Sequence, residues 1–215
     1  MSFVRKNNIY KNFSYIYPPR PEFKISADQL IKYDKDYLIQ PKLNGSCALI
    51  FIKGGEIRNF GRHKNENLSN FKLTNEDLKI LNCNNDNWNV IVGEYMNKNK
   101  KGLDGKHWNH KFVIFDILVY NDKYLVGTTY SERIQLLDDI FGVVDENEYL
   151  YKITDKIFRV KTFYDNFLER WNNIIKIDML EGFVLKKMKQ KLEVGIREKN
   201  NLQIKCRKPT KNYHF

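Results

Sequence analysis

The stretch Pro41-Lys-Leu-Asn-Gly-Ser46 (PKLNGS) stands between the hydrophilic run KYDKDYLIQ and the apolar run CALIFI. The apolar run is of the kind that forms a buried strand, so Lys42 lies just before the start of a predicted strand. Asn44-Gly45 is a strong turn signal. An exposed lysine near a turn is most often a solvated charge, so the residues alone leave open that Asn44-Gly45 is only a hairpin turn.

Further strands are predicted after this stretch. CALIFI, the turn at Lys53-Gly-Gly-Glu56 and EIRNF indicate a β-hairpin, because Gly-Gly supplies the positive-φ turn. The apolar run KFVIFDILVY, which contains Asp116, is predicted to end at a turn formed by Asn121-Asp122. Four more strands are predicted, at NVIVGEYM, KFVIFDILVY, GFVLKK and LQIKCR.

Helices are predicted between these strands. Ser26-Ala-Asp-Gln29 is typical of a capping box that opens a short helix to about Tyr33. Thr129-Tyr-Ser-Glu132 is a second capping box, with Gly142 placed to end its helix. A third helix is indicated by an apolar stripe at Phe163, Phe167, Trp171, Ile174 and Ile175. Strands dominate and no βαβ rhythm is present, so the predicted class is α+β with mainly antiparallel sheet.

Length and composition indicate one folded domain. The 215 residues suffice for one core, and we expect a single domain over residues 1–215 with 1–25 as an extended N-terminal segment. The net charge of +11 favours a polyanionic partner, although a merely basic protein from an AT-rich genome would also fit. No run is typical of a signal peptide or membrane span, so we expect an intracellular, cytoplasmic monomer with no membrane partner.

Charged residues recur at the ends of the predicted strands or within them. Burying an unpaired charge on such a strand costs several kcal/mol, so these residues should face a common polar cleft. A cleft with more cations than carboxylates suits a polyphosphate with one or two divalent metals. The set, with one aromatic residue, is Lys42, Arg62, Glu94, Phe115, Glu181, Lys186, Lys205 and Arg207.

These residues carry a resemblance. PKLNG resembles the KxDG motif of covalent nucleotidyltransferases, the superfamily of ATP-dependent DNA and RNA ligases and mRNA capping enzymes. FGRHK, VGEY, FVIFD, EGFVLKK and QIKCRKPTKNYHF resemble the motifs that follow it. Any one of these is weak, but six in the family order between Lys42 and Arg207 cover most of the chain. The resemblance is closest to a minimal ligase adenylylation domain without an OB fold.

The resemblance implies roles around a nucleotide. Lys42 would attack the α-phosphate of ATP and hold AMP as a phosphoramidate. Arg62 would contact the ribose or a phosphate, and Glu94 the ribose hydroxyls. Phe115 would stack on the adenine. Gln40 stands where family members recognise the base edge.

The resemblance also implies roles around the phosphates. Glu181 would hold a catalytic Mg²⁺ or Mn²⁺, while Lys186 and Lys205 would grip the α-phosphate in the transition state. Arg207 takes the place of the second basic residue of the fifth motif and would help to bind the nucleotide. AMP would then pass to a 5′-phosphate end, and a 3′-hydroxyl would seal the strand.

The chain departs from the family pattern in three ways. Asn44 replaces the aspartate of KxDG, Cys47 stands where DNA ligases often have arginine, and no room for an OB fold follows the fifth motif. The absence of an OB fold favours an RNA ligase over a DNA ligase, whereas Asn44 in place of aspartate is expected to alter the rate more than to abolish the reaction. A virus-encoded repair enzyme would fit the size and the Asn-rich composition. The alternatives are a minimal DNA ligase, a non-catalytic protein that binds nucleotides or nucleic-acid ends, and, more weakly, a capping enzyme that uses GTP.

Overall fold

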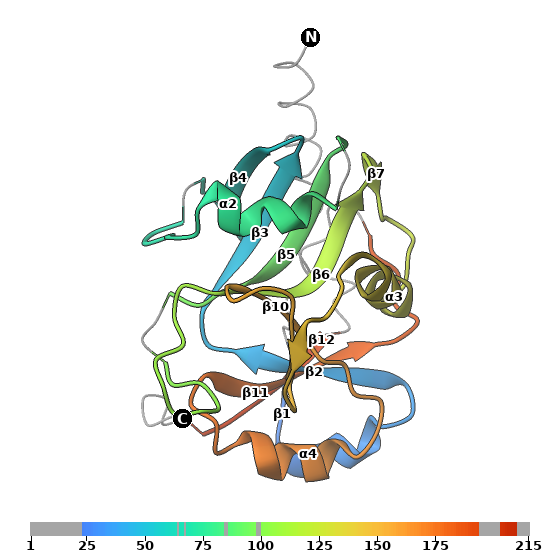
Figure 1. The fold of residues 1–215 in the computed structure, drawn as a ribbon. Helices are drawn as coiled ribbons and strands as arrows, with labels where there is room; N and C mark the ends of the chain where they lie inside the picture. The colour runs from blue at the N-terminus through green and yellow to red at the C-terminus, as the bar shows by residue number, and fades with distance from the viewer. Residues whose placement is uncertain are drawn as a thin grey trace.

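Two β-sheets form most of the structure (Figure 1). The computed structural model describes residues 23–63, 65–66, 68–83, 86–97, 100–193 and 203–209. The strands are β1 (Phe23–Ile25), β2 (Tyr37–Leu43), β3 (Ser46–Lys53), β4 (Glu56–Gly61), β5 (Asn89–Tyr95), β6 (Phe112–Tyr120), β7 (Lys123–Tyr124), β8 (Asp145–Glu146), β9 (Leu150–Lys152), β10 (Ile157–Val160), β11 (Leu180–Lys187) and β12 (Gln203–Arg207). The α-helices are α2 (Asn75–Leu78), α3 (Tyr130–Ile140) and α4 (Phe167–Ile174), and the 3₁₀ helices are η1 (Ala27–Lys32) and η2 (Lys79–Asn82).

The smaller sheet has the strand order β1-β12-β11-β2. The larger has the order β4-β3-β5-β6-β10-β9-β8, with β7 paired to β6, and stands above the smaller sheet in Figure 1. Within the described residues, the only parallel strand pairs are β1 with β12 and β10 with β6. The predicted α+β class with mainly antiparallel sheet is therefore confirmed.

The chain passes from one sheet to the other after Leu43, the residue that follows Lys42. β2 belongs to the smaller sheet, where it pairs with β11, whereas β3 pairs with β4 and β5 in the larger sheet. Asn44-Gly45 joins β2 to β3, so it is not a hairpin turn and that alternative is wrong. The hairpin predicted one strand later is present, with Gly54 and Gly55 at its turn.

The two predicted capping boxes are present, but the end of the second helix and the start of the third differ from the prediction. Capping boxes form at Ser26 and at Thr129, although the first opens a 3₁₀ helix. α3 ends because the backbone of Phe141 is extended, one residue before Gly142. The apolar stripe of the third helix is shorter than expected. Of the five residues of the stripe, only Phe167, Trp171 and Ile174 are buried in the helix. Phe163 precedes the helix, because α4 begins after Asn166. Ile175 follows its last residue and is 41% exposed.

Hydrophobic clusters hold the helices against the sheets. One cluster packs η1 and α4 on the smaller sheet through Leu30, Trp171 and Phe183. Another joins the larger sheet to α2 and α3 through residues such as Ile91 and Leu137. Of the N-terminal segment expected over 1–25, only β1 lies within the described residues, and there it pairs with β12. None of the described helices is long and apolar enough to span a membrane.

Candidate active site

A pocket with an empty volume of about 470 Å³ opens between the two sheets. The smaller sheet contributes β2, β11 and β12, and the larger contributes β5, β6 and the residue after β4. Six of the nine predicted site residues line it, and the lining consists of Gln40, Pro41, Lys42, Leu43, Arg62, Glu94, Phe115, Val184, Lys186 and Gln203. Residues that are distant in sequence are thus brought to one cavity.

Lys42 forms an ion pair at the edge of this pocket. Its Nζ donates to Glu181 Oε2 at 2.5 Å, and Arg207 donates to the same oxygen from Nη2 at 2.6 Å and Nε at 3.1 Å. Burial alone would raise the pKa of Glu181, but Lys42 and Arg207 outweigh it and hold that pKa below its usual value. Arg207 is not among the pocket residues, and its described contact is with this carboxylate.

Gly182 explains how these three side chains meet. It lies opposite Lys42 on β2 and opposite Arg207 on β12, so β11 brings all three strands into register there. Its φ is +137°, and a Cβ would lie 2.1 Å from the Cys206 carbonyl oxygen. Only glycine fits this position without displacing β12. The neighbouring Glu181 stands at the irregular point of β11, between Leu180 and Gly182.

Glu94 is tied to the turn that follows Lys42. Its Oε1 accepts from the Gly45 backbone N–H at 2.9 Å. Burial raises the pKa of Glu94, although Lys42, the Gly45 N–H and Arg62 act against that shift. A Cβ at Gly45 would lie 2.4 Å from the Tyr95 carbonyl oxygen, so glycine is required by the close approach of the turn to β5.

Phe115 and Lys186 meet at the back of the pocket. Lys186 is 3% exposed, and its Nζ donates to the Phe115 carbonyl oxygen at 3.1 Å. The same Nζ lies 5.3 Å from the centre of the Phe115 ring and 5.0 Å from that of Tyr130. Burial lowers the pKa of Lys186 to about 8; Asp116 opposes this shift and Arg133 adds to it.

Gln40 offers an unused acceptor to the pocket. Its Nε2 donates to Thr162 Oγ1 at 3.0 Å, while its buried Oε1 has no hydrogen-bond partner among the described residues. A buried acceptor without a partner is costly, so the site suits a ligand that brings an N–H donor. An adenine amino group supplies such a donor, and Phe115 supplies a ring beside it. The residues present therefore fit an adenine nucleotide.

Gln203 lines the pocket and was not predicted. It occupies the same face of β12 as Lys205 and Arg207, because alternate residues of a strand share a face. That two-residue spacing was the signal that could have found it. Lys205 is not among the residues that line the pocket. It lies beside the pocket, because Val184, its cross-strand neighbour on β11, is a lining residue.

Two carboxylates are available for a metal ion, Glu94 and Glu181. Within the described residues, no three His, Cys, Asp or Glu side chains form a metal-binding group. Mg²⁺ is usually held by one or two protein carboxylates with substrate phosphates and water, so this donor set fits a metal that arrives with a nucleotide.

Comparisons with known proteins agree with this geometry. The family model for the ATP-dependent DNA ligase domain matches residues 22–205. The fold is similar to mycobacterial DNA ligase D complexed with ATP and MES, with a TM-score of 0.58 and 16% identity over 80% of this chain and 54% of that chain. No characterised protein matches the chain by sequence.

Two further solved structures have the same fold. The ligase domain of LigD from M. tuberculosis has a TM-score of 0.59 and 16% identity, over 86% of this chain and 59% of that one. A structure from a study of Lig E DNA ligases has a TM-score of 0.53 and 15% identity, over 89% of this chain and 69% of that one. The chain thus spans little more than half of the two ligase D structures.

Proposed function

Because the chain belongs to the family of ATP-dependent DNA ligase domains, we propose that it joins polynucleotide ends with ATP through a covalent AMP on Lys42. The observation that carries the proposal is a single pocket that collects an amine, a carboxylate, an aromatic ring and two further cations, namely Lys42, Glu94, Phe115, Arg62 and Lys186. A ligand that has a base, a ribose and phosphates matches these groups together.

In the first step, Lys42 Nζ forms a bond to the α-phosphorus of ATP. The bond between that phosphorus and the oxygen that bridges the α- and β-phosphates breaks. Pyrophosphate leaves. Nζ loses two protons in all, one to become the neutral amine that attacks and one as the N–P bond forms. Glu181 Oε2, at 2.5 Å from Nζ, is within reach of the first, and the second passes to the leaving pyrophosphate or to water. AMP then moves from Lys42 to a 5′-phosphate end, and a 3′-hydroxyl attacks that end and releases AMP.

The nucleotide would be held by groups from both sheets. Gln40 Oε1 would accept from the adenine amino group, and Phe115 would stack on the base. Glu94 would accept from the ribose hydroxyls, and Arg62 would contact the ribose or a phosphate. The similar mycobacterial ligase D structure is a complex with ATP, which supports this choice of nucleotide.

The phosphates would be held by cations of the smaller sheet. Lys186 and Lys205 would neutralise charge on the α-phosphate as pyrophosphate leaves, and Arg207 would keep Glu181 in place. Glu181 would hold Mg²⁺ or Mn²⁺ together with phosphate oxygens. The metal, when bound, would polarise the phosphate and stabilise the leaving group.

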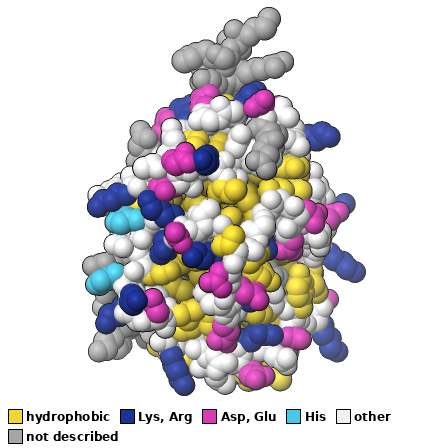
Figure 2. Space-filling model, viewed as in Figure 1, with side chains coloured by type: hydrophobic (Ala, Val, Ile, Leu, Met, Phe, Trp, Pro, Cys, Tyr) yellow, Lys and Arg dark blue, Asp and Glu magenta, His cyan; other side chains and the backbone are white. Residues whose placement is uncertain are grey.

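The proposed partner is a nucleic acid with 5′-phosphate and 3′-hydroxyl ends. The net charge of +11 favours a polyanion, and on the face shown in Figure 2 the cations are interspersed with acidic side chains. The family model is that of DNA ligases, so DNA is the first strand to test. The preference for RNA that was expected from the sequence stays a prediction.

The test begins with purified protein, Mg²⁺ and α-labelled ATP or GTP, followed by a denaturing gel. We expect a label that survives denaturation and comes from ATP alone. Nicked duplexes with DNA or RNA strands then report which end is joined. If the folded protein takes no label over a range of pH and metal, the proposal is wrong and a non-catalytic nucleotide-binding protein, with Asn44 as its signature, is favoured.

The pH dependence should report on Lys186. We expect kcat/KM for adenylylation to fall above about pH 8, because the Lys186 cation is present below its pKa of about 8 and is lost above it. Arginine remains charged throughout this range, so Lys186→Arg should remove the fall. Lys187→Arg, at the exposed next position of β11, should keep the wild-type profile. A fall that persists in Lys186→Arg would assign it to another group.

A further inference from the structure

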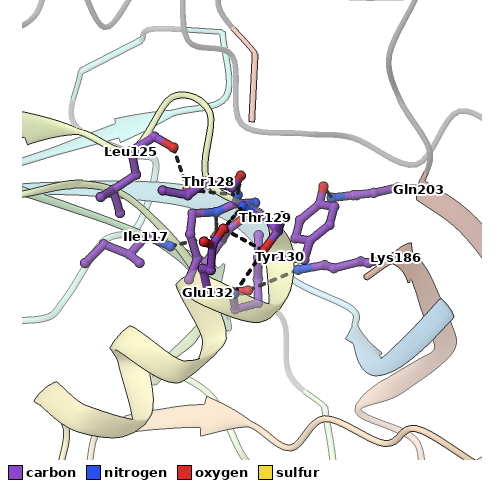
Figure 3. A network of polar contacts seen from close by, with 11 residues as sticks. Ile117, Leu125, Thr128, Thr129, Tyr130, Glu132, Lys186 and Gln203 are labelled. Carbon is purple, nitrogen blue, oxygen red and sulfur yellow. Dashed lines mark hydrogen bonds and ion pairs between the residues drawn. The ribbon is translucent and has the colours of Figure 1, made fainter. Parts of the chain in front are cut away.

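Tyr130, in the first turn of α3, contacts two residues that line the pocket, Lys186 and Gln203 (Figure 3). Tyr130 is 4% exposed, and its Oη accepts from Gln203 Nε2 at 2.5 Å. The centre of its ring lies 5.0 Å from Lys186 Nζ, which is within the range of a cation–π contact. One tyrosine thus holds the ends of two pocket side chains through different groups, its hydroxyl and its ring.

Lys186 and Gln203 are neighbours before Tyr130 contacts them. They are directly opposite each other on the antiparallel strands β11 and β12, so their side chains lie on the same face of the smaller sheet. Figure 3 shows both reaching toward Tyr130 from that sheet. Long side chains have many rotamers, and a shared contact at their tips restricts both at once.

Tyr130 itself is fixed to the larger sheet. The Arg133 guanidinium lies 4.6 Å from the centre of the Tyr130 ring. Arg133 donates to both carboxylate oxygens of Asp116 on β6, from Nε at 2.7 Å and from Nη2 at 3.2 Å, and to the Thr128 carbonyl oxygen at 2.8 Å. Asp116 follows Phe115, so the support for Tyr130 and the aromatic wall of the pocket belong to one strand.

We propose that Tyr130 is a positioning residue for adenylylation, which sets Lys186 and Gln203 against the α-phosphate end of the bound nucleotide. This inference rests on the proposed function. Tyr130 does not line the pocket, so it acts on the reaction through the two side chains that do. Its hydroxyl orients the Gln203 amide, and its ring keeps the Lys186 ammonium beside the Phe115 carbonyl oxygen.

The test compares two substitutions of Tyr130 in single-turnover formation of the protein–AMP adduct at a series of ATP concentrations. Tyr130→Phe keeps the ring and loses the acceptor for Gln203, and we expect the rate at saturating ATP to fall about tenfold with less than a twofold change in the ATP concentration for half-maximal rate. Tyr130→Leu loses both contacts, and the fall should be larger, on the order of a hundredfold.

Tyr149→Phe is the matched control. Tyr149 is 1% exposed and its hydroxyl donates to Glu148 at 2.8 Å, but it does not line the pocket. Its adduct rate should match wild type even if its melting temperature falls. An unchanged rate in Tyr130→Phe, or an equal loss in Tyr149→Phe, would overturn the positioning role alone. A wild-type protein that forms no adduct would overturn the proposed function and this inference with it.

Discussion

Lys42→Ala is expected to abolish the covalent adduct with AMP, a loss of roughly ten-thousandfold or more, because no other group supplies the bond to phosphorus. Stability should change by less than about 1 kcal/mol. The Lys42 and Glu181 side chains are 21% and 18% exposed, and Arg207 stays on Glu181 when Lys42 is removed. The measurements are the label retained on a denaturing gel and the free energy of unfolding in urea.

Two variants sharpen the result. Lys42→Arg keeps a cation for Glu181 but remains protonated, so it should lose the adduct as completely as alanine does. Lys123→Ala removes an exposed lysine of β7 and should label like wild type. A label that persists in Lys42→Ala would identify a different nucleophile, and a loss of several kcal/mol in stability would mean that Lys42 mainly serves the fold.

Arg133→Met is expected to reduce the free energy of unfolding by about 3–5 kcal/mol. The side chains of Arg133 and Asp116 are 1% and 4% exposed. Removing the guanidinium leaves the Asp116 carboxylate buried without its counter-ion, and the Thr128 carbonyl oxygen loses one of its two donors and keeps the Leu192 N–H. Arg133 also holds the pKa of Asp116 below its usual value against the effect of burial. Urea denaturation measures the change.

The matched comparison is Arg170→Met, which breaks an ion pair with Asp165 whose side chains are 31% and 69% exposed. That change should cost about 1 kcal/mol or less. Adding Asp116→Asn to Arg133→Met removes the unpaired charge and should restore part of the stability, which a double-mutant cycle quantifies. If Arg133→Met reduces the free energy of unfolding no more than Arg170→Met does, the Asp116 carboxylate must be stabilised by other groups or by water once Arg133 is removed.

Local signals predicted six of the twelve described strands, two helix starts and most of the pocket, but β2, which carries Lys42, was read as a hydrophilic run. Capping boxes and apolar periodicity depend on residues close in sequence, so Ser26 and Thr129 were identified correctly. The motif residues were found because charges on apolar strands must face a polar cleft. Four of these charged residues line one cavity, together with Phe115 and Gln40, which the family motifs indicated.

Long-range pairing could not be predicted in this way. Nothing local to Asn44-Gly45 indicates that β2 and β3 enter different sheets, because that depends on β11 and β5 as partners. Gln203 was missed because a neutral amide on a strand carries no charge signal. The buried pair of Asp116 and Arg133 joins a strand to a helix, and the sequence showed only an isolated acid in an apolar run.

The passage of the chain between sheets at Asn44-Gly45 has a thermodynamic consequence. The pocket exists only while the two sheets are docked, since each supplies part of its wall. A nucleotide that contacts both walls binds the docked state alone, so its binding free energy adds to the free energy of docking by mass action. The occupancy of the pocket and the free energy that holds the two sheets together are therefore thermodynamically linked. If ATP is the ligand, its concentration in the cell would affect both.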